Sequence, residues 1–587
     1  MKFFFKNVLS TIVGMVLAVF VIVLLFIGIV SVSISSINND KEVIVKENSI
    51  LKINLAELSV VERTSENPFK GLNFSGDLPK TIELKQVLDN IEKAKKDENI
   101  KAIYINTPYA SAGISQIEEI RNKLLEFKQT GKPIIAYSEV YNQAAYYLSS
   151  VANKIYLTPE GIVELKGLSA SIMFYKGLLN KLDIDVQIIR HGKFKGAVEP
   201  FVLDKMSLAN REQMQLLLNS FADNIMDSIA NQRELTLTQV QKHANTLILE
   251  NAKSCVDYNY VDALLYQDQL EDTLRALAGA EKLSIVTLSK YTNVKEEKKD
   301  ISRNKIAIIY ATGSINSGKG DMKSIGSAST SAAIKKARKD KNVKAIVLRI
   351  NSPGGSALAS DVIWRETILA KAEKPLVVSM GDYAASGGYY IACAADSIVA
   401  NPTTLTGSIG VFGMIPNLSE FYKNKLGITI DTVNTSKYAD MGTNRPLSSF
   451  EKNKLQKSVS DMYTGFITKV GEGRNMSTAE VNEIGQGRVW TGYDAKEIGL
   501  IDTYGGLEKA IDIAAYLAKV EDYRIISLPK KKNPLEDFSL KLSGGEASIS
   551  DLILSKFNFT TQITQPIEEL LKGDRIQARV PFIMELK

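Results

Sequence analysis

Histidine and cysteine are almost missing from this sequence of 587 residues, which contains two of each. With only His191 and His243 available, a zinc site built from several histidines is disfavoured, and there are too few cysteines to replace them. Cys255 and Cys393 lie far apart and form neither a CxxC pair nor a disulfide framework. We expect no metal and no cofactor, and we favour two buried free thiols over one bridge.

A strong charge of one sign is also missing. The 72 basic residues nearly balance the 66 acidic ones, which leaves a net charge of +6, and there is no arginine-rich tract. A nucleic-acid-binding function is therefore disfavoured. The apolar fraction of 45% and the charged fraction of 24% are those of an ordinary globular protein, and the length requires two or more domains.

Charged residues are absent between Lys6 and Asp40. This gap holds an apolar run, residues 8–30, which is long enough for a helix to cross the ~30 Å hydrocarbon layer of a membrane. A cleavable signal peptide has a shorter apolar core, so we predict an uncleaved single-pass anchor within residues 1–40. The lysines before the run favour a cytoplasmic N-terminus, which places the rest of the chain outside the cytoplasm.

The chain repeats itself at a nearly constant offset. KAIYINTPYASAG begins at Lys101 and KAIVLRINSPGGSA begins at Lys344, and each is followed by a helical pattern, a proline-led apolar run and a pair of tyrosines. Short β-rich runs alternate with helical patterns in both copies, which predicts an α/β fold with mainly parallel sheets. Runs such as AIVLRI are apolar almost throughout, as expected of strands covered on both faces.

The repeat divides the chain into two tandem domains. Residues 203–250 and 448–486 have helical patterns and are interpreted as inserts in the two copies. The expected boundaries are 41–294 for the N-terminal domain, 295–305 for a charged linker, 306–527 for the C-terminal domain and 528–587 for a tail.

One serine stands among small neighbours in GDYAASGGYYIACAAD, residues 381–396. Ser386 follows a strand pattern, and a peptide backbone could approach it closely because the flanking residues are alanine and glycine. The alternative is a serine that only caps the start of a helix. The aligned residue of the first copy is Gln143, so that copy has no hydroxyl here.

The turn NSPGG, residues 351–355, is a candidate oxyanion site. It follows a strand pattern, and Gly354 and Gly355 can turn their backbone N–H groups outward. A strand-to-helix turn without a chemical role is the alternative. The first copy, NTPYA, has lost both glycines, which favours a role beyond turn geometry.

A nucleophilic serine needs a base, and the sequence offers two kinds. His191 could form a serine–histidine pair with Ser386. A lysine can serve instead when burial lowers its pKa, because desolvation disfavours the charged form. Lys195 lies in GKFKGAVEPF of the first copy, and the second copy has Ala439 at the matching position. Each copy thus retains one group that the other has lost, and we interpret Ser386 and Lys195 as parts of one shared site.

The blocks GKFKGAVEPF, INSPGGS, GDYAASGGYYIA and TGSIGVFG closely resemble the long, duplicated form of the signal peptide peptidase SppA (protease IV) family, peptidase family S49. The resemblance covers nearly all of residues 1–525. It implies a ClpP/crotonase-type fold of ββα units and a homotetramer. It also implies a membrane-anchored serine protease of the bacterial inner membrane that degrades cleaved signal peptides and other apolar peptides.

Carried over residue by residue, the resemblance makes Ser386 the nucleophile and Lys195 the general base of a Ser–Lys dyad. Ser408, in the GSIG block, would orient the lysine by a hydrogen bond. The oxyanion donors would be the backbone N–H groups of Gly354 or Gly355 and of Gly387.

Two other functions stay open at this point. A crotonase-type acyl-CoA enzyme shares the oxyanion turn, but it would need neither Ser386 nor Lys195, and a membrane anchor would be unusual for it. A non-catalytic membrane scaffold would keep the shape alone, although the retained serine and lysine argue against it. Both arrangements of the dyad, within one chain or between neighbouring subunits, also stay open.

Overall fold

The computed structural model describes residues 6, 10–11, 13–18, 20–21, 43–64, 80–295, 302–321, 324–530 and 576–580. Most of the apolar run interpreted as a membrane anchor, residues 8–30, lies outside these described residues. Within the part that is described, no helix has the length and apolar character needed to cross a membrane.

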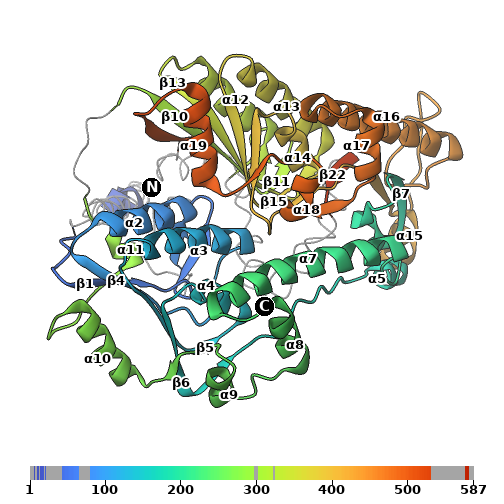
Figure 1. The fold of residues 1–587 in the computed structure, drawn as a ribbon. Coiled ribbons are helices and arrows are strands. Elements are labelled where there is room, and N and C mark those ends of the chain that lie inside the picture. Colours follow the sequence, from blue (N-terminus) through green and yellow to red (C-terminus); the bar gives the residue numbers. More distant parts are fainter. Residues whose placement is uncertain are drawn as a thin grey trace.

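The first half of the chain is built on a six-stranded parallel sheet, shown in Figure 1. Its order is β8 (Ala263–Leu264), β6 (Lys154–Val163), β5 (Ile134–Tyr141), β4 (Ile100–Ile105), β1 (Ser49–Ile53) and β9 (Ser284–Thr287).

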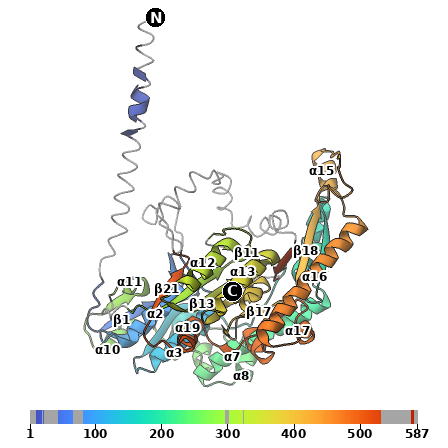
Figure 2. The same ribbon diagram turned by 90° about the horizontal axis from the view of Figure 1, so that it is seen from above.

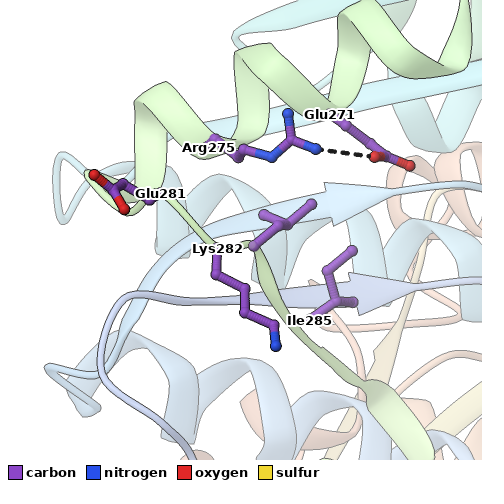
Figure 3. A pocket seen from close by; sticks show the side chains of 6 residues that line it. Glu271, Arg275, Glu281, Lys282 and Ile285 are labelled. Carbon is purple, nitrogen blue, oxygen red and sulfur yellow. Dashed lines mark hydrogen bonds and ion pairs between the residues drawn. The ribbon is translucent and has the colours of Figure 1, made fainter.

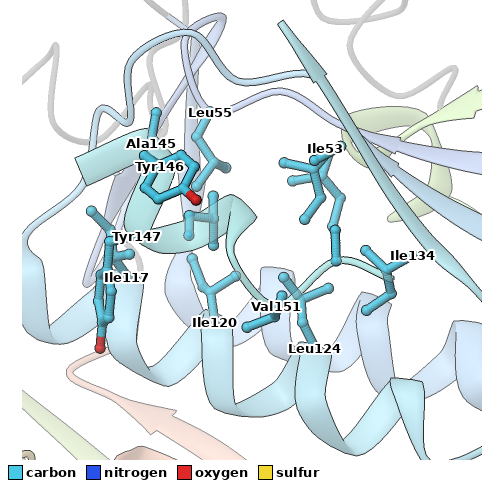
Figure 4. Packing of buried hydrophobic residues seen from close by; sticks show 14 of the residues in the cluster. Ile53, Leu55, Ile117, Ile120, Leu124, Ile134, Ala145, Tyr146, Tyr147 and Val151 are labelled. Atoms are coloured by element: carbon cyan, nitrogen blue, oxygen red, sulfur yellow. The ribbon is translucent and has the colours of Figure 1, made fainter. Parts of the chain in front are cut away.

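Helices cover both faces of this sheet, which explains why its strands are apolar throughout. One face packs against α2 (Leu84–Lys96), α3 (Ile114–Lys128) and α4 (Gln143–Ser149). Figure 4 shows part of this core, where Ile117 and Ile120 of α3 lie near Tyr146 of α4. The other face packs against Leu270 and Leu274 of α10 (Gln267–Ala278).

The second half repeats this plan on a larger sheet. Its main path is β19 (Val489–Thr491), β17 (Leu405–Gly407), β15 (Leu376–Ala385), β13 (Val343–Ser352), β10 (Lys305–Thr312) and β21 (Arg524–Leu528). β16 (Ser397–Ala400) also pairs with β15, and β20 (Thr503–Tyr504) pairs with β16. The β17–β19 pair is antiparallel, and the other pairs are parallel.

Helices cover this sheet on both faces as well. α12 (Ser327–Lys339), α13 (Ala357–Lys371) and α14 (Gly387–Ala392) pack on one face, and α19 (Leu507–Ala518) packs on the other. α14 follows β15 as α4 follows β5, so the two copies have the same order of elements around the aligned Ser386 and Gln143. The domain boundaries given above stay predictions.

A third sheet joins the two halves. Its order is β12 (Ser324–Gly326), β11 (Ser314–Asn316), β14 (Gly354–Ser356), β22 (Ile576–Arg579), β18 (Val411–Asn417) and β7 (Asp185–His191). β7 comes from the first half, yet it pairs antiparallel with β18 of the second half over seven residue pairs, from Val411↔His191 to Asn417↔Asp185. The chain of the first half is thereby carried to the catalytic face of the second.

The predicted inserts form long helices in both halves. They contain α7 (Leu208–Arg233) with α8 (Leu237–Thr246), and α16 (Ser449–Arg474) with α17 (Thr478–Ile484). Ser207 and Ser448 cap the two long helices, each accepting a hydrogen bond from a backbone N–H of the first turn. α7 reaches the second half, where the Gln213 side chain accepts a hydrogen bond from the Val489 N–H at 2.8 Å.

The remaining elements are short. Figure 2 shows α15 (Ser419–Leu426) and β18 in an arm that projects from the body. The others are β2 (Leu58–Val61), β3 (Lys80–Glu83), α5 (Lys176–Lys181), η1 (Gly196–Val198), α6 (Glu199–Val202), α9 (Ala252–Asp257), α11 (Leu288–Tyr291) and α18 (Gly492–Glu497).

A buried ionic cluster joins the halves. Arg349 of β13 is fully inaccessible, and its guanidinium lies 2.8 Å from Glu62 and 2.8 Å from Glu119, both in the first half. Buried charges are tolerated only when they are paired and hydrogen-bonded. The cluster therefore requires the two halves to be docked against each other.

Candidate active site

Lys195 and Ser386 lie in direct contact within one chain. The Lys195 Nζ atom donates a hydrogen bond to the Ser386 Oγ atom at 2.7 Å. Both residues have an exposed fraction of 0%. Of the two arrangements left open above, this is the one within a single chain.

Lys195 reaches this position because β7 ends beside it. The chain turns at Gly192, whose φ of +114° is a conformation that L-residues rarely adopt, and a Cβ there would lie 2.6 Å from the Gln486 backbone. The Phe194 N–H then donates to the Gln486 carbonyl at 2.8 Å. The lysine loop is thus seated on the loop after α17 of the second half.

The surroundings of Lys195 favour its neutral form. Burial lowers the pKa of Lys195 well below its usual value of 10.5, because desolvation disfavours the ammonium. Besides Ser386, its Nζ atom donates to the Ser408 carbonyl and to the Ser408 Oγ, both at 3.0 Å. Ser408 therefore fixes the amine from two of its own atoms.

Ser386 adopts an unusual backbone conformation, with φ 56° and ψ −112°. It lies between the end of β15 and the start of α14, and its N–H donates to the Gly407 carbonyl at 2.7 Å. Non-glycine residues in such conformations are costly, and they are found most often at functional sites. The side chain makes no hydrogen bond that caps α14, so the helix-cap interpretation does not account for this serine.

The glycines of the NSPGG turn lie beside the nucleophile loop. Gly354 has φ +98° and Gly355 has φ +157°. A Cβ added to Gly354 would lie 2.8 Å from the Gly387 nitrogen, so the turn and the amide after Ser386 are neighbours. Backbone amides gathered beside a nucleophile are the donors that an oxyanion needs.

Sequence analysis did not single out Ser352. Its Oγ atom accepts a hydrogen bond from the Gly354 N–H at 3.2 Å, which holds the turn in place. Ser352 belongs to the NSPGG motif, but a hydroxyl that bonds two residues along the chain is common in ordinary turns. The motif therefore gave no separate signal for it.

The corresponding place in the first half has a structural role. Gln143 begins α4, and its side-chain oxygen accepts hydrogen bonds from the N–H groups of Lys166 and Gly167 at 3.2 and 3.0 Å. A buried amide that is used in this way offers no nucleophile. Ala439, which aligns with Lys195, lies in a different setting, between α15 and α16.

The histidines lie in other environments. His191 pairs with Val411 in the third sheet, and its ring stacks on Tyr463 with 4.0 Å between centroids. His243 lies on α8, and its Nδ1 atom is 3.1 Å from the Tyr260 hydroxyl. The base that contacts Ser386 is the lysine.

The cysteines and the open hollows lie away from this contact. Cys255 and Cys393 are buried free thiols. Figure 3 shows a hollow beside α10, where Arg275 pairs with Glu271. None of the candidate site residues lines it.

Comparisons with known proteins agree with the duplicated plan. The profile of Peptidase family S49 matches the chain twice, over residues 126–281 and 368–521. Protease 4 of Salmonella typhi is 36% identical over 543 residues, which cover 89% of this chain and 87% of that protein. Protease 4 of Haemophilus influenzae is 32% identical over 478 residues, covering 79% of this chain and 76% of that protein.

Two further matches extend this set. The chloroplastic serine protease SPPA of Arabidopsis thaliana is 34% identical over 514 residues, which cover 86% of this chain and 75% of that protein. A ClpP1 mutant from Listeria monocytogenes aligns with 35% of this chain and 94% of its own at 15% identity, and its TM-score of 0.24 is too low to carry an argument.

The class that follows from these relatives is a serine protease. The chain belongs to Peptidase family S49, whose profile it matches in two tandem regions over more than half of its length. The predicted duplication and the predicted family are therefore confirmed, and the acyl-CoA enzyme and scaffold interpretations are set aside.

Proposed function

We propose that this protease cuts peptide bonds with a Ser–Lys dyad formed by Ser386 and Lys195 of one chain. The observation that carries the proposal is the 2.7 Å hydrogen bond between the buried Lys195 amine and the Ser386 hydroxyl. A buried lysine with a lowered pKa can accept a proton near neutral pH, which an ordinary exposed lysine cannot do.

The reaction begins when neutral Lys195 takes the proton of Ser386 and the serine oxygen attacks a peptide carbonyl. The backbone N–H groups of Gly354 or Gly355 and of Gly387 stabilise the negative charge that develops, and one such donor contributes about 2.7–4 kcal/mol. Protonated Lys195 then gives its proton to the leaving amine. Water activated by the same amine hydrolyses the acyl-enzyme.

Ser408 is a positioning residue in this scheme. Its carbonyl and hydroxyl oxygens both accept hydrogen bonds from the Lys195 amine. With these two acceptors and Ser386 at normal hydrogen-bond distances, the amine has little freedom to turn away from the nucleophile.

The cellular setting is part of the proposal. The apolar run at 8–30 supports a single-pass anchor in the bacterial inner membrane, with the N-terminus in the cytoplasm and the protease domains outside it. The resemblance noted above supports cleaved signal peptides and other apolar peptides as substrates, a ClpP/crotonase-type fold and a homotetrameric assembly.

Peptide cleavage by the purified full chain tests the dyad. Ser386→Ala and Lys195→Ala should each lower kcat/KM for an apolar reporter peptide by about 10³-fold or more, as loss of a nucleophile or its base does in other serine proteases. Lys193→Ala is the matched control, because Lys193 is an exposed lysine of the same loop. Near-normal activity of Lys195→Ala would refute the assignment.

A further inference from the structure

The C-terminal strand β22 lies between two strands that border the dyad (Figure 1). It runs antiparallel to β14 on one side and to β18 on the other. Since β14 contains the glycines assigned above as oxyanion donors, β22 follows the edge on which an extended peptide substrate would add as a strand. The paired residues are Gly354↔Arg579, Gly355↔Ala578, Ser356↔Gln577, Phe412↔Gln577 and Gly413↔Ile576.

The Ala578 carbonyl faces the oxyanion glycines. A Cβ added to Gly354 would lie 2.1 Å from the Ala578 oxygen and 2.8 Å from the Gly387 nitrogen. A Cβ added to Gly387 would lie 3.2 Å from the same oxygen and 3.2 Å from the Gly355 nitrogen. The carbonyl oxygen and the two amides therefore share one small space.

The register of the ladder gives the same result. The Val580 N–H donates to the Pro353 carbonyl at 2.9 Å, so these residues form a hydrogen-bonded pair. Hydrogen-bonded pairs recur every second residue in an antiparallel ladder, and the next one joins Ala578 to Gly355. In that pair the Gly355 N–H points at the Ala578 carbonyl, as an oxyanion donor points at a scissile carbonyl.

The side chains of this segment fit the groove. Ala578 has an exposed fraction of 0%, which leaves room for little more than a methyl group. Val580 is buried in an apolar pocket that includes Phe221 of the first half and Ala385 and Leu405 of the second. Alternate residues of the tail are thus received on one side, as in bound extended peptides.

No external peptide can reach the dyad while the tail occupies this place. Ser386 and Lys195 are both completely inaccessible to solvent. An incoming substrate would need the same edges of β14 and β18 that β22 already uses. The first peptide bond offered to Ser386 is therefore in the chain's own tail.

We propose that the C-terminal tail is an intramolecular substrate of this protease, cut between Ala578 and Arg579. The inference rests on the proposed function, because it needs the Ser386–Lys195 dyad. The cut frees the segment Arg579–Lys587 and opens the groove to external peptides.

The step balances as an ordinary hydrolysis. The Ser386 oxygen bonds to the Ala578 carbonyl carbon as its proton passes to Lys195, and the Ala578–Arg579 bond breaks as that proton passes to the Arg579 nitrogen. Water then cleaves the Ala578 ester, which leaves a carboxylate on Ala578 and restores the Ser386 hydroxyl. No oxidant, metal or other co-reactant is needed.

The test follows both tail cleavage and reporter-peptide cleavage in the same samples of full chain. Intact-mass and C-terminal peptide analysis should find chains ending at Ala578 in the wild type and chains ending at Lys587 in Ser386→Ala. Ala578→Trp should keep its tail, because the fully buried methyl site has no room for an indole. Gln577→Ala, at the half-buried neighbouring position, is the matched control and should still be cut at the same bond.

Dilution and mixing decide whether the cut is intramolecular. The fraction cut per unit time should not change over a tenfold dilution, and tagged Ser386→Ala chains should stay intact when mixed with wild type. Cutting of those tagged chains at this bond would overturn the proposal, as would a cut that persists in unmixed Ser386→Ala.

The two proposals fail separately. A wild type that cleaves the reporter peptide but keeps its Ala578–Arg579 bond would overturn the tail cleavage and leave the proposed function standing. A wild type that cleaves neither would overturn both.

Discussion

Arg349 of the second half and Glu62 of the first form a fully buried ion pair, with the arginine Nε atom 2.8 Å from the carboxylate. Glu119 completes the cluster from α3. Arg349 lies on β13, the strand that leads into the oxyanion turn, so the contact that docks the halves is continuous with the site that they share.

Replacement of Arg349 by methionine should destabilise the protein strongly, because it leaves two buried carboxylates without their cation. We expect the free energy of unfolding to fall by about 3–5 kcal/mol, measured by urea denaturation. Arg275→Met is the control, since its partners Glu271 and Asp272 are exposed and such pairs contribute at most about 1 kcal/mol. Equal losses in the two variants would contradict the role given to the buried cluster.

Gly354→Ala should impair catalysis more than folding. Its φ of +98° and the lack of space for a Cβ both disfavour alanine, and the added methyl would occupy the position of the scissile carbonyl. We expect kcat/KM for a reporter peptide to fall by about 10²-fold or more. Gly318→Ala is matched in backbone, with φ +86° and nothing within 4 Å of an added Cβ, and it should retain activity.

Removal of the Ser408 hydroxyl should slow the chemical step and shift its pH dependence. A lost hydrogen bond of about 1.5 kcal/mol lowers kcat by about tenfold, with little change in KM. Because the hydroxyl accepts a hydrogen bond that favours the protonated lysine, its loss should move the acidic limb of the pH–rate profile to lower pH. Ser408→Ala and Ser408→Gly should agree, since the glycine variant tolerates the φ of 50° at this position. An unchanged profile in both would contradict the positioning role.

The stability of the protein should depend on pH through Lys195. Burial holds the pKa of this lysine well below 10.5 in the folded chain, so between the folded pKa and 10.5 the unfolded chain binds the extra proton. The free energy of unfolding contributed by this group therefore rises with pH in that window, by up to about 1.4 kcal/mol per pH unit. The difference between wild type and Lys195→Met, measured by denaturation at several pH values, should grow as pH increases. A difference that stays constant would mean that Lys195 titrates normally.

The sequence identified the two reacting residues because the duplication left complementary losses. Ser386 faces Gln143 in the alignment and Lys195 faces Ala439, and this contrast is visible without any structure. The exchange of β7 into the sheet of the other half was not predictable, because the pattern DVQIIRH suits an edge strand of either sheet.

Two other features depend on contacts between distant parts of the chain. Arg349 lies inside AIVLRI, which was interpreted as an apolar run, and nothing local signals that its partners are more than two hundred residues away. The short segment Ile576–Arg579 was predicted as a strand-like part of the tail, but its place beside the oxyanion turn follows only from tertiary pairing.

The most direct test of the dyad is the rate at which a fluorophosphonate labels Ser386 as a function of pH. In the wild type, in Lys193→Ala and in His191→Ala, the rate should rise with pH through a midpoint well below 10.5, as the neutral lysine becomes available. In Lys195→Ala the rate should fall by about 10²–10⁴-fold, and that titration should be lost. Labelling of Lys195→Ala at the wild-type rate, or loss of labelling in His191→Ala alone, would contradict the account.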